Sequence, residues 1–145
     1  MKTKYRDIII IIVVSLIALF GYFMFKKAFN DKTYDKAIVK FNGEVVATVY
    51  FKERRVEKEV EGEYPKIDLK NNFIIILGNP QEENKRYEVF IKYNFEKRSM
   101  QIAKEESPKK YCSREGEKTS GSITCLPNGV VISFENYGDD FDGYV

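Results

Sequence analysis

AIVKFNGEVVATVYF, the stretch from Ala37 to Phe51, decides the fold that we expect for this chain. β-Branched and aromatic residues fill both arms of the stretch, and Asn42-Gly43 lies between them. An Asn-Gly pair between two such arms is the strongest short-range signal for a β-hairpin, because both residues tolerate the left-handed angles of a two-residue turn. Apolar residues occupy both faces of the second arm, so we expect this strand to be at least partly covered on both sides.

Short strand-like segments continue to the end of the chain. The predicted strands are an edge strand or extended arm at 55–60, a short strand at 67–69, a buried strand at 73–77, an alternating strand at 86–95, a strand at 99–103 and a last hairpin formed by 122–126 and 130–134. No segment beyond residue 36 shows convincing helical periodicity. Many short strands at short spacing predict an all-β fold, either a small barrel or a sandwich.

Upstream of the strands lies an apolar run, IIIIIVVSLIALFGYFMF, from Ile8 to Phe25, with no charge and no proline. As a helix it would measure about 27 Å, close to the ~30 Å hydrocarbon core of a bilayer. We expect one N-terminal transmembrane helix that stays uncleaved. A cleaved signal peptide and a buried soluble helix are the alternatives; the first is disfavoured because signal-peptide apolar regions are usually about 7–15 residues long.

Basic residues near the start of the run set the expected orientation. Lys2, Lys4 and Arg6 precede the run, and positive charge beside a first helix tends to remain in the cytoplasm. The expected organisation is a cytoplasmic stub at 1–7, a transmembrane anchor at 8–25, a stalk at 26–36 and an extracytoplasmic β domain at 37–145. The expected location is the cell membrane, crossed once, with the C-terminal domain outside.

The composition argues against several classes of function. The 145 residues include no histidine, which removes the commonest general base and metal ligand. The net charge is only +2, with acidic and basic residues interspersed, so no footprint for nucleic acid is evident. No glycine-rich phosphate-binding loop occurs. We therefore expect no catalytic residues, no metal and no cofactor, and we do not expect an enzyme.

Two cysteines, Cys112 and Cys125, are the remaining reactive side chains. An extracytoplasmic domain would permit a disulfide between them, which we expect. Two free thiols and a redox-active pair are the alternatives, and the spacing is far from the Cys-x-x-Cys pattern of redox motifs.

The last third of the chain, SPKKYCSREGEKTSGSITCLPNGVVISF from Ser107 to Phe134, resembles the NusG domain II family of small membrane-anchored bacterial proteins. The matching residues are Pro108, Cys112, Gly116, Cys125, Leu126, Pro127 and Asn128. Ser107 stands where the family has its first cysteine, which leaves Cys112 and Cys125 as the only possible pair. The resemblance implies a compact, barrel-like β fold outside the membrane. We expect the motif residues to serve structure and not chemistry, because Pro127 fixes φ and Asn128-Gly129 can adopt the left-handed angles of a turn.

These observations lead to two hypotheses of function. The first is a membrane-anchored, extracytoplasmic β domain that acts as a non-catalytic binding or assembly module. Its expected partners are the membrane, through Ile8 to Phe25, and another membrane or envelope protein, but no nucleic acid. The alternative is a membrane-tethered envelope enzyme or redox accessory factor.

Overall fold

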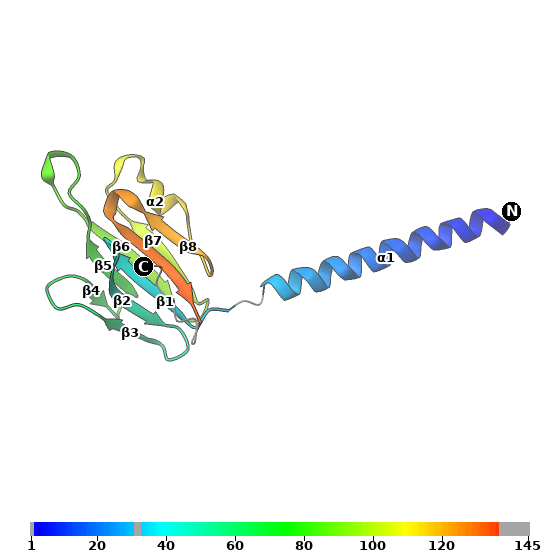
Figure 1. The fold of residues 1–145 in the computed structure, drawn as a ribbon, viewed down its shortest axis with the longest axis horizontal. Coiled ribbons are helices and arrows are strands. Elements are labelled where there is room, and N and C mark those ends of the chain that lie inside the picture. Colours follow the sequence, from blue (N-terminus) through cyan, green and yellow to red (C-terminus); the bar gives the residue numbers. More distant parts are fainter. Residues whose placement is uncertain (1, 31–32, 137–145) are drawn as a thin grey trace, which may run out of the picture. The chain divides into compact units, whose positions relative to one another are not determined.

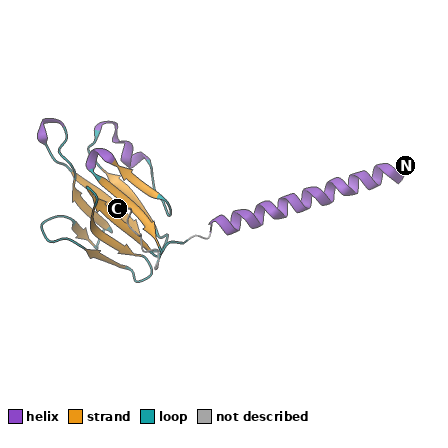
Figure 2. Cartoon of the chain, in the orientation of Figure 1, coloured by secondary structure: helices purple, strands orange, loops and turns teal. Residues whose placement is uncertain are grey.

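A computed structural model of the chain describes residues 2–30 and 33–136. The chain divides into two units, Met1–Lys32 and Thr33–Val145. The first unit holds one helix and the second holds the strands, which Figure 2 distinguishes by colour.

Helix α1 spans Lys2–Asn30, so it includes the predicted apolar run and extends into the stretch predicted as a stalk. Its described large apolar side chains, from Ile8 to Met24, are between 47% and 69% exposed. Within the described residues, no helix meets the length and hydropathy required of a membrane span.

The second unit consists of two antiparallel sheets (Figure 1). The five-stranded sheet has the order β3-β2-β1-β9-β8, and its strands are β1 Lys36–Phe41, β2 Glu44–Tyr50, β3 Arg55–Lys58, β8 Ser122–Cys125 and β9 Val130–Glu135. The four-stranded sheet has the order β4-β5-β6-β7, and its strands are β4 Lys66–Asp68, β5 Phe73–Leu77, β6 Glu88–Asn94 and β7 Ser99–Lys104. Shorter helical elements are η1 Glu82–Asn84, η2 Pro108–Lys110, α2 Tyr111–Arg114 and η3 Leu126–Asn128.

The hairpin predicted around Asn42-Gly43 is confirmed. Phe41 pairs with Glu44, and both turn residues have positive φ, 50° at Asn42 and 89° at Gly43. The register shifts between Val39 and Lys40, because Val46 is an extra residue in β2. Four successive residues of β2, from Val46 to Val49, are buried, so both faces of this part of the strand are covered, as the sequence predicts.

A single core lies where apolar side chains of both sheets meet. The five-stranded sheet contributes Val39, Val49, Ile123 and Ile132, all fully buried, and the four-stranded sheet contributes residues at alternate positions. Along β6 these are Val89, Ile91 and Tyr93, as the alternation in the sequence predicts. Full burial of each such side chain stabilises the fold by roughly 1.5–3 kcal/mol.

The structure differs from two of the expectations about the fold. The described strands form two separate sheets and not a closed barrel, so of the two predicted architectures only the layered one is present. The segment 104–120, for which the sequence predicts neither a strand nor a helix, contains η2 and the four-residue helix α2. A helix this short has no apolar periodicity that a sequence could reveal, and α2 lacks a side-chain cap.

Both ends of the strand unit are defined by the pairing of β1 with β9. Lys36 pairs with Glu135 at one end, and Phe41 pairs with Val130 at the other. The chain thus enters β1 and leaves β9 at the same end. We call the opposite end the distal end; it carries the 42–43 turn, the connection between β5 and β6, η3 and α2 (Figure 1).

Candidate functional site at the distal end

The two cysteines form a disulfide at the distal end, as the sequence predicts. Cys112 in α2 is bonded to Cys125 at the end of β8, with 5.3 Å between their Cα atoms. The exposed fractions of the two residues are only 4% and 0%. The bond therefore joins α2 to the edge of the five-stranded sheet from within the protein.

A buried acid, Glu105, organises the loop next to this disulfide. Its side chain is 1% exposed and accepts hydrogen bonds from the backbone N–H groups of Ser107 at 3.2 Å, Cys112 at 3.1 Å and Ser113 at 3.4 Å. A fourth bond, at 3.0 Å, comes from Asn128 Nδ2. Four N–H donors compensate for the loss of water around this carboxyl group.

The loop backbone adopts unusual angles between Glu105 and α2. Lys109 and Lys110 both have positive φ, 65° and 49°, and Tyr111 returns to the right-handed region. The N–H of Lys110 donates to the Ser107 carbonyl at 3.1 Å, whereas the N–H groups of Cys112 and Ser113, in the first turn of α2, donate to Glu105.

Side-chain amides connect the other distal loops. Asn42 and Asn79 exchange two hydrogen bonds, at 2.9 and 3.0 Å. Gln81 donates to the Pro127 carbonyl at 2.7 Å, and the Asn128 carbonyl accepts the N–H of Asn79 at 3.3 Å. Asn128 therefore links three loops, because its own amide bonds Glu105. This network fixes the distal surface to both sheets.

An apolar hollow of about 290 Å³ lies beside the disulfide. Tyr111 and Leu126 on its wall are 57% and 78% exposed, and Pro127 is also exposed. Lys109 places its Nζ 5.9 Å from the centre of the Tyr111 ring. We call the group Lys109, Lys110, Tyr111, Arg114, Leu126 and Pro127 the distal patch.

A second concave surface, a groove of about 300 Å³, lies where the β1–β2 hairpin approaches β5. Phe41, Val46 and Ile76 are among its apolar walls, and Glu44 and Glu61 are exposed at its rim. Arg86 also lines the groove, but its guanidinium group donates to the carbonyls of Gly78 at 2.9 Å and Leu77 at 3.0 Å.

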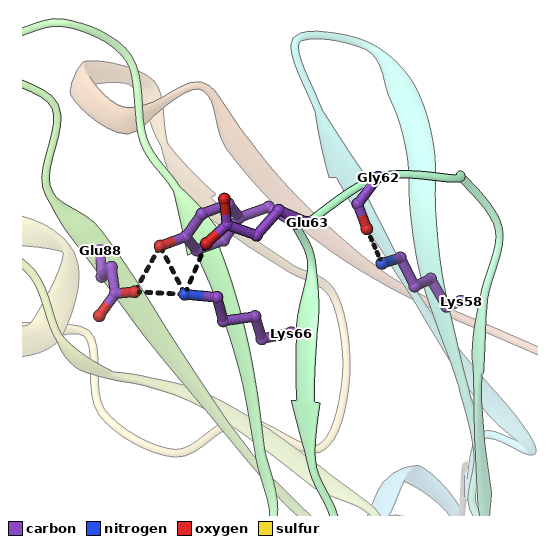
Figure 3. A network of polar contacts seen from close by, with 6 residues as sticks. Lys58, Gly62, Glu63, Lys66 and Glu88 are labelled. Carbon is purple, nitrogen blue, oxygen red and sulfur yellow. Dashed lines mark hydrogen bonds and ion pairs between the residues drawn. The ribbon is translucent and has the colours of Figure 1, made fainter.

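The connection between β3 and β4 forms one wall of the groove, and a network of polar contacts holds it in place (Figure 3). The Tyr64 hydroxyl donates to Glu88 at 2.5 Å, and Lys66 Nζ donates to the Tyr64 oxygen at 2.9 Å and to Glu88 at 3.3 Å. Glu63 forms an ion pair with Lys66 at 3.2 Å. Lys58 donates to the Gly62 carbonyl at 2.6 Å, so both sides of the connection are tied down.

These contacts shift the pKa values of two groups in the network. The pKa of Glu88 is lowered, first because the Tyr64 hydroxyl bonds its carboxylate and then because of Lys66. The pKa of Lys66 is raised, chiefly by its hydrogen bonds to Tyr64 and Glu63. Both shifts favour the ionised forms, so the network keeps its charges at neutral pH.

Most of the residues that the sequence analysis singled out lie near one another at the distal end. Cys112, Cys125, Leu126, Pro127 and Asn128 all lie at the distal end. Pro108 is in the first turn of η2. Gly116 has φ of 74°, and a Cβ there would meet no atom within 4 Å, so its role is the turn that follows α2.

Sequence reasoning missed Glu105, Asn42, Asn79 and Gln81. Glu105 lies in the polar segment KEES, which reads as surface. A signal for the asparagines did exist, since Asn42 belongs to the hairpin turn and Asn79 to a Gly-Asn-Pro stop, but nothing local indicates that they bond each other.

The distal end holds one group of potential metal ligands among the described residues. Oxygen or sulfur atoms of Glu105, Cys112 and Cys125 lie within 4.8 Å of one another. The metal-binding form of cysteine is the thiolate, and here both sulfurs are in the disulfide while the Glu105 oxygens already accept N–H donors. In this oxidised form the group is structural.

Comparison with known proteins gives one match. The family model of NusG domain II matches residues 8–138, which is most of the chain. This confirms the resemblance seen between Ser107 and Phe134. No curated protein and no solved structure matches the chain.

Proposed function

We propose that this chain, which belongs to the NusG domain II family, is a membrane-anchored extracytoplasmic module that binds another membrane or envelope protein without catalysing a reaction. One observation carries the proposal. The distal end, opposite the point where the chain enters the strand unit, gathers two concave surfaces and the exposed Leu126 and Tyr111. Exposed apolar groups around a hollow mark surfaces that bind other molecules.

The apolar run in α1 supports the anchoring part of the proposal. Its isoleucine, leucine and phenylalanine side chains face outward from the helix, where water would be an unfavourable surrounding. The family match begins at Ile8, the first residue of the run. The basic stub before the run favours a cytoplasmic N-terminus.

The polar groups of the distal end support binding and not catalysis. Among the described residues, Glu105, Asn128 and Gln81 use their side chains to hold loops together. Arg86 is likewise engaged with backbone carbonyls. The redox alternative gains little support, because an exchange partner would have to reach sulfur atoms in residues that are 4% exposed or less.

Two experiments test the two parts of the proposal. Protease added to intact cells should digest the region after Lys36, whereas protection until the membrane is permeabilised would reverse the orientation, and recovery of the chain in the soluble fraction would remove the anchor. A photoreactive amino acid in place of Glu61, at the groove, or Leu126 should capture an envelope or membrane protein. The same group in place of Leu69, which is 67% exposed at the other end of the unit, is the control. Equal capture from both ends, or none from the distal end, would refute a distal binding surface.

A further inference from the structure

We propose that the distal patch binds an acidic segment of a partner protein, in which an apolar residue lies between aspartate or glutamate residues. This inference rests on the proposed function and specifies the chemistry of the partner. It is carried by the exposure of the apolar residues and by the charge around them.

The apolar centre of the patch consists of Leu126, Tyr111 and Pro127. Leu126 is 78% exposed, the highest value among the described large apolar residues, although the hollow beside it would take a side chain. The disulfide fixes α2 to β8 directly beneath it, so this centre is presented on a rigid base. Preorganised apolar and aromatic groups of this kind anchor protein interfaces.

The charge around this centre is positive. Lys109, Lys110 and Arg114 are exposed, and none of them takes part in an ion pair within the described part of the chain. Glu115, which also lines the hollow, is paired with Lys118 at 2.6 Å. Unpaired cations at the rim of an apolar surface favour a partner that brings carboxylates to the rim.

A protein segment fits this surface better than a polyanion such as nucleic acid. The centre of the patch requires an apolar group, and a chain of aspartate or glutamate with leucine or phenylalanine supplies both chemistries in one short stretch. The lipid bilayer, a second copy of the chain and the chain's own segment DDFD at 139–142 are the other occupants that the test must separate.

Binding of defined peptides to the full chain in lipid nanodiscs is the first test. The probe is a ten-residue peptide with two leucines among six glutamates; its controls replace the leucines by serine or the glutamates by lysine. Leu126→Ser and the double variant K109Q/K110Q should each weaken binding of the probe at least tenfold. Leu69→Ser and Lys70→Gln change a matched exposed leucine and lysine at the other end and should leave it unchanged. Equal binding of either control peptide, or equal loss in the matched variants, would overturn the inference.

Capture in cells is the second test. A photoreactive group in place of Leu126 should form an adduct within an acidic segment of another protein, and K109Q/K110Q should abolish it while Lys70→Gln does not. Adducts with lipid, with a second copy or with residues 139–142 of the same chain would overturn the inference. Capture that persists from the groove at Glu61 while it fails at Leu126 would overturn this inference alone, whereas a chain that is not membrane-bound would overturn the proposed function.

Discussion

Replacement of Glu105 by glutamine tests whether one buried carboxyl group holds the distal end together. The change preserves the size of the side chain but substitutes an NH₂ group for one oxygen. If the remaining oxygen keeps the N–H groups of Cys112 and Ser113, the new NH₂ group faces the Ser107 N–H and Asn128 Nδ2, two donors that lie 3.2 and 3.0 Å from the lost oxygen.

The expected cost follows from these two donors. Each buried donor without an acceptor costs about 1–3 kcal/mol. Asn128 keeps a contact at 3.1 Å to the Cys125 sulfur, so we place the total near the lower part of the range, at about 2–4 kcal/mol. That is a large fraction of the 5–15 kcal/mol typical of a whole domain.

Urea unfolding of a fragment spanning residues 33–145, followed by circular dichroism, measures this cost. Glu106→Gln is the matched control, because Glu106 is the exposed neighbour of the buried acid and should change stability by less than about 0.5 kcal/mol. Equal stability of the two variants would refute the reasoning. An unfolded Glu105→Gln variant beside a folded Glu106→Gln variant would mean that the cost exceeds our estimate.

Three further predictions concern the disulfide, a turn and the groove wall. Changing both Cys112 and Cys125 to serine should lower the free energy of unfolding by about 3 kcal/mol, since the bond closes a loop of 13-residue separation; reduction of the unaltered protein should give a similar loss, and an unchanged urea midpoint would contradict it. Gly129→Ala should destabilise more than Gly43→Ala, because both glycines have positive φ but only at Gly129 would a Cβ overlap Asn42 and Asn79; equal midpoints would mean that the asparagine pair yields freely. Tyr64→Phe should raise the pKa of Glu88 toward its ordinary value, as followed by NMR titration. A carboxyl group whose pKa is lowered by folding stabilises the fold at pH values above its unfolded pKa of about 4.3. The difference in stability between the unaltered protein and Tyr64→Phe should therefore be full at neutral pH and disappear as the pH falls through the lowered pKa of Glu88. A pH-independent difference would argue against this linkage.

Strands and tight turns were predictable because their signals are local. The alternation of Val89, Ile91 and Tyr93 reports one buried face, and Asn42-Gly43 reports a turn, without reference to the rest of the chain. The last hairpin followed from Pro127, Asn128 and Gly129 in the same way, and Gly129 does adopt a left-handed φ of 69°.

The arrangement of the strands and the identity of the site residues could not be predicted, because neither is a local property of the sequence. Whether β3 and β8 meet β4 and β7 to close a barrel depends on twist and register, which alternation does not encode. The groove draws its walls from β1, β2, β5 and two connections that are far apart in sequence. Glu105 has the appearance of a surface residue until the loop after it returns and surrounds its carboxyl group.

The position of β1 between β2 and β9 has a consequence for how the domain is made. The first strand to be synthesised acquires one of its two neighbours at once, through the hairpin, but waits for the other until nearly the whole domain has been produced. Until Val130–Glu135 arrives, one edge of β1 is unpaired, and a strand in that condition readily joins the wrong chain. A chain that stalls or is cut before this segment should therefore be a target for aggregation and proteolysis, and the appearance of protease resistance should coincide with the synthesis of the last strand.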